Sequence, residues 1–503
     1  MKVNKSDLVK FLSKDEQEIV LSYLNTIKPI GLNKKKNYKE KELFELFNKP
    51  EAHSLTQQEL RKKLKIDRID MLKSNLFTKV VEAITFEKHI NNQKIFSRND
   101  SIIFSLKKEM LAIRILYRNI TKNKSEPLFA WLENLIHKAI EHEVYDVVIE
   151  ALLLKKYSIS LRKGIKEFDK INSKIEHFRY CNTALYNATD DYTKLILNNE
   201  FQEHYSLEEI KTLLKSAIIR LEKDYKSTGS EQINYYLQIL LLANYEKEKK
   251  YRNAIAQCKK IIALLKKNSI IFRQERVGFV LDHMSQFQVY ISEYSKAAIS
   301  ALKAQSYYLE NSFFTLVSKE QEFYAHFYDG NLIKANICTN ILLNHPLADT
   351  GEFRKAKFIY YKACILFEEK EYATAWKILK NNLEIEKDKN RWNISLRILC
   401  IQLFIELKKL DEATRGIEAL RKHISRQSKN NTIRERDHII LNCLKELEKN
   451  GYNFNAKNFR LKILLKELTG ERKKNHWEHY SHELVKFHTW LESKLIKKTP
   501  GNA

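Results

Sequence analysis

Residues 360–367, YYKACILF, are followed after a short polar turn by residues 372–376, YATAW. The first stretch is apolar at helical spacing, and the second places Ala375 three positions after the large side chain of Tyr372. Two helices can cross closely only where a small residue lies between them, and a large neighbour then fills the space beside the turn. The two stretches therefore predict an antiparallel helix pair.

This pattern recurs five times between about residues 236 and 423. Each copy has an apolar helix, a polar turn and a second helix, and successive alanines lie 43, 38, 40 and 38 residues apart. A lone helix pair cannot bury its apolar face, so stacked neighbours are needed and a solenoid is expected. The five pairs are Tyr251/Ala254, Tyr294/Ala297, Leu332/Ala335, Tyr372/Ala375 and Leu410/Ala413.

The repeats resemble the tetratricopeptide-repeat (TPR) family, whose small–aromatic–turn–aromatic–Ala signature is clearest in Ala363, Phe367, Tyr372 and Ala375. The segment 330–335, GNLIKA, matches the family's Gly-x-Tyr-x-x-Ala turn with leucine in place of tyrosine. The period here is longer than the 34 residues usual for the family. The resemblance implies an all-α, TPR-like α-solenoid of antiparallel helix pairs.

The same resemblance implies that the first helix of each pair lines a concave groove that takes a peptide or partner helix. Tyrosine suits such a groove because it combines a large contact area with a polar tip. The alternative is that several of these residues fill the space between adjacent repeats. The positions expected in the groove are Tyr236, Asp282, Gln286, Tyr290, Tyr324, Tyr328, Lys357, Tyr360 and Glu368.

Four segments are expected along the chain. They are a helical N-terminal module (1–95), degenerate helical repeats (96–230), the TPR-like repeats (231–425) and a C-terminal cap with a short tail (426–503). The cap is expected to end in a helix over about 475–496, which closes the solenoid with an apolar inner face. That face would carry Trp477, Tyr480, Leu484, Phe487, Leu491 and Leu495.

Three histidines of this last segment, His476, His479 and His482, are spaced at i, i+3 and i+6. Two histidines three or four residues apart on a helix can share a metal ion, but the third would have turned away from them. No cysteine or second histidine cluster completes the set. A solvated helix face is therefore expected, with no metal site.

An alternative function comes from residues 55–76, which resemble the start of a repressor-type helix-turn-helix. Thr56 and Glu59 form a capping-box pattern before a short helix expected at 56–65, and a second helix is expected at 68–90. A DNA-binding regulator with a TPR-like sensor domain would follow from this resemblance. The residues facing the major groove would be Arg68, Asp70, Lys73, Ser74 and Asn75.

Composition restricts the remaining functions. The formal charge is +26, which suits an anionic partner such as nucleic acid but also follows from the lysine-rich composition of an AT-rich genome. The 10 glycines form no phosphate-binding loop, and no nucleophile motif occurs, so no enzyme activity and no cofactor are expected. Six scattered cysteines and the absence of a long apolar run indicate a cytoplasmic protein without membrane insertion. The expected function is a protein-binding module or scaffold.

Overall fold

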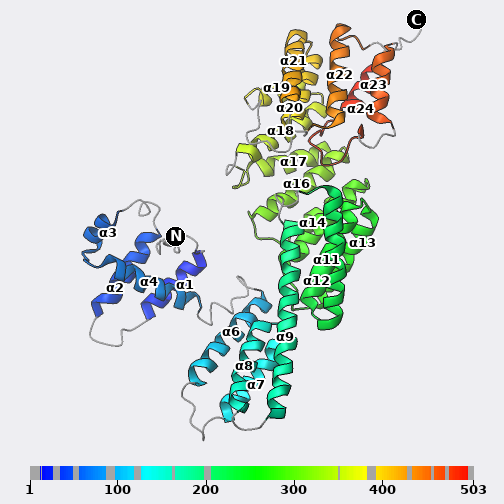
Figure 1. The fold of residues 1–503 in the computed structure, drawn as a ribbon. Helices are drawn as coiled ribbons and strands as arrows, with labels where there is room; N and C mark the ends of the chain where they lie inside the picture. The colour runs from blue at the N-terminus through cyan, green and yellow to red at the C-terminus, as the bar shows by residue number, and fades with distance from the viewer. Residues whose placement is uncertain are drawn as a thin grey trace. The chain divides into compact units, whose positions relative to one another are not determined.

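The computed structural model describes residues 12, 14–26, 34–48, 56–85, 97–117, 126–160, 165–197, 205–348, 352–381, 392–427, 433–454, 458–470 and 475–496. All regular secondary structure in these residues is helical (Figure 1), which confirms the all-α prediction. None of the described helices is both long and apolar enough to cross a bilayer.

The chain forms two compact units. The first comprises residues 1–197, 219–237 and 267–272, and the second comprises residues 198–218, 238–266 and 273–503. The four segments expected from the sequence (1–95, 96–230, 231–425 and 426–503) are defined by sequence pattern, whereas the two units are defined by the compactness of the fold. The four segments therefore stay predictions. The boundary near residue 95 and the polar linker at 428–432 lie outside the described residues.

Two hydrophobic cores lie within the described part of residues 1–197. The first core joins α1 (Lys14–Thr26), α2 (Lys34–Phe47), α3 (Gln57–Leu64) and α4 (Ile69–Ile84). The second joins α6 (Arg98–Tyr117), α7 (Glu126–Glu141), α8 (Tyr145–Ser160) and α9 (Ile165–Tyr192). A π-helical turn (Thr193–Leu197) follows α9, and α7 packs on α8 as an antiparallel pair.

Two longer helices, α11 (Leu207–Thr228) and α12 (Glu231–Lys247), precede the regular repeats. The Ser206 hydroxyl accepts a hydrogen bond from the Glu209 backbone, and the Glu209 carboxylate accepts one from the Ser206 backbone, so α11 opens with a capping box. The helix stops before Gly229, whose φ of +66° suits a residue without a side chain.

The repeat helices begin where the sequence pattern places them. Each second helix of a pair starts at the predicted large residue, and the alanine three positions later is completely buried in all five copies. The five repeats are therefore confirmed. First helices are α12, α14 (Gln274–Tyr290), α16 (Phe313–Tyr328), α18 (Glu352–Glu368) and α20 (Trp392–Glu406); second helices are α13 (Tyr251–Lys267), α15 (Tyr294–Gln305), α17 (Leu332–Leu343), α19 (Tyr372–Leu379) and α21 (Leu410–Gln427).

The five turns inside these pairs share one backbone conformation. Each has a left-handed residue, with φ between +57° and +78°, and the amide after it reaches back to the carbonyl five positions earlier. This is the Schellman closure of a helix C-terminus, and it reverses the chain within two residues. The left-handed residues are Lys249, Ser292, Gly330, Lys370 and Lys408.

After the repeats come α22 (Glu435–Lys449), α23 (Phe459–Thr469) and α24 (Phe487–Ile496). The prediction of one helix over 475–496 is wrong, because α24 begins only at Phe487 and residues 477–486 form no regular helix. Helix propensity gives little support to residues 477–486, which contain two histidines, a tryptophan, a tyrosine and a serine. Their side chains are bound instead by the repeats and by Arg434 and Arg436.

Replacing Ala375 with arginine should destabilise the repeats by more than about 3 kcal/mol, because a large charged group would enter a fully packed interior. The measurement is thermal or urea unfolding followed by circular dichroism. Thr374→Arg is the matched control, since Thr374 is exposed in the same turn of α19 and its replacement should change stability little. Equal stability of the two variants would contradict the packing described.

Candidate peptide-binding site

Tyrosines from three successive first helices, and one from a second helix, gather on one surface of the second unit. Tyr290 and Tyr328 are the last residues of α14 and α16 and occupy equivalent positions, seven residues before the buried alanine of their repeats. Tyr324 lies one helical turn before Tyr328, Tyr360 lies on α18, and Tyr294 begins α15. These five residues, four of them predicted from the sequence, are called the tyrosine face below.

Residues 475–486 lie on this face. The chain leaves α23 and passes beside α16 and α18 before it enters α24 (Figure 1). The Tyr480 ring packs against Tyr324 and Tyr290, with centroid distances of 4.7 and 5.4 Å. Sequence reasoning placed a peptide on these tyrosines, and the structure shows that a non-helical segment of the same chain occupies them.

Two further aromatic side chains of the segment extend this contact. The His479 ring is 5.2 Å from the Tyr328 ring, and its Nε2 lies 3.0 Å from the Tyr294 hydroxyl. The Trp477 ring meets Tyr328 edge to face at 5.3 Å, an arrangement that suits the charge distribution of aromatic rings. Aromatic packing therefore supplies most of the contact between this part of the segment and the repeats.

An ion pair joins the segment to the neighbouring repeat. Glu478 Oε1 lies 2.7 Å from Nζ of Lys249, the left-handed residue of the α12–α13 turn. Both side chains are exposed. An exposed pair of this kind contributes little affinity, at most about 1 kcal/mol, but it favours an acidic residue at this position.

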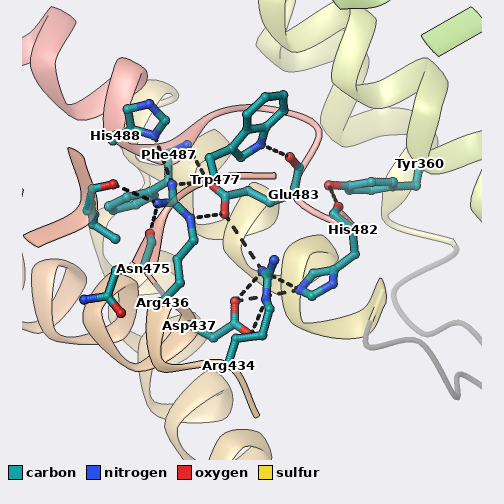
Figure 2. A network of polar contacts seen from close by, with 11 residues as sticks. Tyr360, Arg434, Arg436, Asp437, Asn475, Trp477, His482, Glu483, Phe487 and His488 are labelled. Carbon is teal, nitrogen blue, oxygen red and sulfur yellow. Dashed lines mark hydrogen bonds and ion pairs between the residues drawn. The ribbon is translucent and has the colours of Figure 1, made fainter. Parts of the chain in front are cut away.

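The following residues, 482–486, are held by polar groups (Figure 2). The Tyr360 hydroxyl donates to the His482 carbonyl at 3.0 Å, so a predicted groove tyrosine binds the segment through its backbone. The Glu483 carboxylate accepts from Nε and Nη2 of Arg436, at 2.7 and 2.8 Å, and from the amide of Phe487 at 3.0 Å. Glu483 thus also caps the first turn of α24.

Arg436, on α22, is buried with a relative exposure of 1%, and all five of its N–H donors find partners. Besides Glu483 they bind the carbonyls of Leu468 and Asn475 and Nδ1 of His488. Figure 2 shows Asn475, Glu483 and His488 arranged around the guanidinium. A buried charge with complete pairing of this kind ties α22, α23, the segment and α24 together.

A second pair lies beside it. Arg434 donates to Asp437 at 2.6 Å and lies 2.8 Å from Nε2 of His482. Burial alone would raise the pKa of Asp437, but its contacts with His482 and Arg434 hold that pKa well below its usual range. His482 is therefore bound on both its backbone and its ring.

Residues 475–481 lack this complete pairing. Tyr480 has a φ of +59°, a left-handed backbone that costs a residue with a side chain about 1–2 kcal/mol. Its hydroxyl, the Ser481 hydroxyl and the Asn475 side-chain carbonyl are buried without a hydrogen-bond partner among the described residues. Each such atom costs about 1–3 kcal/mol.

His479 adds a dependence on pH. Burial, and then the positive charge of Lys486, lower the pKa of His479 to about 4. A free histidine titrates near 6.5, so protonation opposes the packed state. The contribution of this ring to packing is complete above about pH 6.5 and is lost as the pH falls towards 4.

The other residues expected in the groove have different surroundings. Asp282 lies between Tyr308 and Ser318, and its burial raises its pKa to about 7. Lys357 pairs with Glu320 at 2.6 Å, and Gln286 lies near the Tyr290 hydroxyl. Tyr236 belongs to the first unit, where its ring is 5.4 Å from that of Tyr192.

Glu368 lines a cavity of about 390 Å³ between the α16–α17 turn, α18 and the start of α24. The cavity wall combines aromatic side chains, among them Phe327, Tyr328 and Trp490, with polar and aliphatic ones. Burial lowers the pKa of Lys486, whose Nζ lies 4.2 Å from the centre of the Trp477 ring. The side chain of Lys486 thus links the cavity to the segment on the tyrosine face.

Burial differs along the tyrosine face. Tyr324 and Tyr360 retain 4% and 2% of their exposure, whereas Tyr290, Tyr294 and Tyr328 are half-buried. Whether these tyrosines bind a partner stays a prediction. Residues 477–480 and Arg436 were not predicted to belong to this site. The available signal is the density of aromatic residues between 477 and 487, which is also typical of the apolar face of a helix.

The expectation that the three histidines of the segment belong to a solvated face of an end helix is wrong, because residues 477–486 form no regular helix and His482 is buried. His476 contacts the Gly470 carbonyl, His479 contacts Tyr294, and His482 contacts Arg434. The described part of the chain holds no group of three or more His, Cys, Asp or Glu side chains placed to bind a metal ion.

The alternative nucleic-acid site lies on α3 and α4 of the first unit. The Thr56–Glu59 capping box opens α3, and Lys65 ends it in a left-handed conformation, with a φ of +51°, before α4 begins at Ile69. Arg68 and Asp70 are exposed, while Lys73, Ser74 and Asn75 are half-buried. The short helix and tight turn are confirmed; α4 spans Ile69–Ile84, and residues 86–90 of the predicted helix lie outside the described residues.

Comparisons with known proteins add little. No protein-family model and no curated protein matches the sequence. Among solved structures, the chain is similar to a signal transduction ATPase with numerous domains (STAND) with a tetratricopeptide repeat sensor, from Pyrococcus horikoshii. The identity is 13%, the match covers 86% of this chain and 67% of that chain, and the TM-score is 0.40. The TPR-like description therefore rests on the helix pairs and turns of this chain itself.

Replacing Glu483 with leucine should lower the free energy of unfolding by about 3–5 kcal/mol, because it leaves the buried Arg436 charge unpaired. Urea unfolding measures the change. Glu478→Leu is the control on the same segment, and removal of its exposed ion pair should cost less than about 1 kcal/mol. If both variants lose the same small amount, the buried pair does not hold the segment.

Proposed function

We propose that this chain is a protein-interaction module whose tyrosine face binds a peptide in a non-helical conformation. The proposal includes no chemical step and treats the chain as a binding protein, not an enzyme. One observation carries it: residues 477–480 of the chain itself lie on this face and make aromatic and ionic contacts with it. A peptide with similar side chains would find the same complementary surface.

Physical chemistry supports tyrosine as the basis of such a surface. The rings offer large contact areas and lose little rotamer freedom, and their hydroxyls can bind backbone groups of a peptide without reading its sequence. Tyr360 already does so with the His482 carbonyl. Sequence preference would come from Lys249, which favours an acidic side chain, and from the ring-sized contacts at Tyr290, Tyr324 and Tyr328.

The test uses a full-length chain in which residues 476–481 are replaced by glycine and serine, so that the face is free. A fluorescein-labelled peptide with the sequence of residues 475–483, NHWEHYSHE, is the probe, and fluorescence anisotropy measures its binding. We expect a dissociation constant in the micromolar range, about 8 kcal/mol of binding free energy. Adding Lys249→Glu should weaken binding severalfold, because it removes the ion pair and brings two carboxylates together.

Lys250→Glu is the matched control, because Lys250 is also exposed but pairs with Glu248, not with the segment. It should leave the affinity unchanged. Absence of binding in a chain with normal helical signal, or equal effects of the two charge reversals, would argue against the proposal.

DNA binding by α3 and α4 is the second candidate function. The observation that favours it is the exposure of Arg61, Lys62, Lys63, Lys65 and Arg68 along α3 and its turn. Basic side chains on a helix and the turn that follows it can contact phosphates while the next helix reaches bases. The clustering of these basic side chains on α3 and its turn supports DNA binding more strongly than the total charge of +26 does.

A gel-shift titration with random-sequence duplex DNA tests this candidate. Lys73→Glu and Arg68→Glu should each weaken binding and reduce its dependence on salt, because each removes a cation near the phosphates. Lys138→Glu, the same charge change at an exposed position of α7, should have little effect. Absence of binding at low salt, or binding that does not respond to salt, would exclude the candidate.

A further inference from the structure

The segment on the tyrosine face consists of two parts that differ in how they are held. Residues 482–485 are buried, and the Glu483 carboxylate is bound by Arg436 and by the amide of Phe487. Residues 476–481 are exposed or half-buried and contact the repeats through rings and one exposed ion pair. Residues 476–481 are called the flap and residues 482–486 the anchor.

The flap has unfavourable features that the anchor lacks. The left-handed backbone of Tyr480 and the unpartnered hydroxyls of Tyr480 and Ser481 all belong to it. Strain and unsatisfied polar groups persist only where surrounding contacts outweigh them, and they are common in elements that move. The flap therefore binds the tyrosine face less tightly than its contact area would allow.

The anchor cannot leave with the flap. If Glu483 moved away, the buried charge of Arg436 would be left unpaired, which is strongly destabilising, and α24 would lose its cap. The indole of Trp477 donates to the Glu483 carbonyl at 2.7 Å, and this is one bond that opening of the flap would break at the anchor. Opening is therefore confined to the flap, between the anchor and α23.

We propose that the flap closes the tyrosine face in cis and that the partner which opens it is a peptide of matching chemistry in a non-helical conformation. This inference rests on the peptide binding proposed above. The peptide carries an aromatic side chain, an acidic residue directly after it and a second aromatic side chain three positions after the first. These three groups correspond to Trp477, Glu478 and Tyr480.

Each group has a defined receptor on the repeats. Tyr328 receives the first ring, Lys249 receives the carboxylate, and Tyr290 and Tyr324 receive the second ring. The flap has the advantage of being tethered, which gives it a high effective concentration at the face. A free peptide has the advantage that its backbone is not held at both ends in the conformation that strains Tyr480. The difference between the free energies with which the tethered flap and the free peptide bind the face determines how much peptide is needed to open the flap.

The experiment compares the full-length chain with two variants that weaken only the flap, Glu478→Lys and Tyr480→Ala. The labelled NHWEHYSHE peptide is the probe, and a peptide with both aromatic residues replaced, NHAEHASHE, is its control. We expect the probe to bind Glu478→Lys severalfold, and Tyr480→Ala at least tenfold, more tightly than the unaltered chain. Glu310→Lys, the same charge change in the exposed turn after α15, should bind like the unaltered chain.

Opening is measured independently by limited chymotrypsin digestion. In the unaltered chain, saturating probe should increase cleavage after Trp477 and Tyr480 several-fold, while NHAEHASHE should not. Glu478 is exposed, so Glu478→Lys should retain the helical signal even if Tyr480→Ala lowers it.

The outcomes separate the two proposals. Tighter binding by the flap variants together with probe-induced cleavage supports the flap as a closing element. Equal affinities in the unaltered chain and the variants would overturn it and leave peptide binding by the face intact. Absence of probe binding in every chain, including the one with the flap replaced by glycine and serine, would overturn both.

Discussion

Arg436 imposes the constraint on which the C-terminal half of the molecule depends. A guanidinium ion cannot remain buried without a counter-charge and acceptors for its five N–H groups. The chain supplies them from Leu468 at the end of α23, from Asn475 and Glu483 in the following segment, and from His488 in α24. Four stretches of sequence are thereby brought to one point.

This arrangement explains why residues 477–486 are not helical. A helix over 475–496 would use its own carbonyls for backbone hydrogen bonds, and the Asn475 carbonyl would no longer be available to Arg436. It would also remove Glu483 from the position in which it caps Phe487. Because the helix propensity of the segment is weak, the non-helical conformation costs little free energy, and the contacts with the buried Arg436 charge favour it.

The same constraint sets the register of the segment on the repeats. Once His482 and Glu483 are held by Tyr360 and Arg436, the residues before them must pass over Tyr324, Tyr328 and Tyr290. The repeats contribute regularity, because the identical turns place Tyr290 and Tyr328 at equivalent helix ends. A repeating surface and a fixed anchor together define where Trp477 and Tyr480 lie.

Binding on this face and binding by α3 and α4 belong to different compact units, so the two candidate functions do not compete for residues.

Local spacing determined much of this structure. The alanine pattern predicted all five repeats, the residue at which each second helix starts, and the polar turns, because close helix crossing and chain reversal depend on residues near one another in sequence. It also identified four members of the tyrosine face, since residues seven to fifteen positions before each alanine keep their place on the first helix.

What covers those tyrosines was decided only by tertiary structure. The apolar spacing of residues 477–495 is compatible with a helix, and nothing local distinguishes that reading from an irregular segment. The deciding interactions join residues separated by 47 positions, between Arg436 and Glu483, and by 122 positions, between Tyr360 and His482. Sequence periodicity predicts which side chains share a helix face. The partners of a buried charge come from residues far apart in the sequence, and only the tertiary structure determines which of them lie close to it.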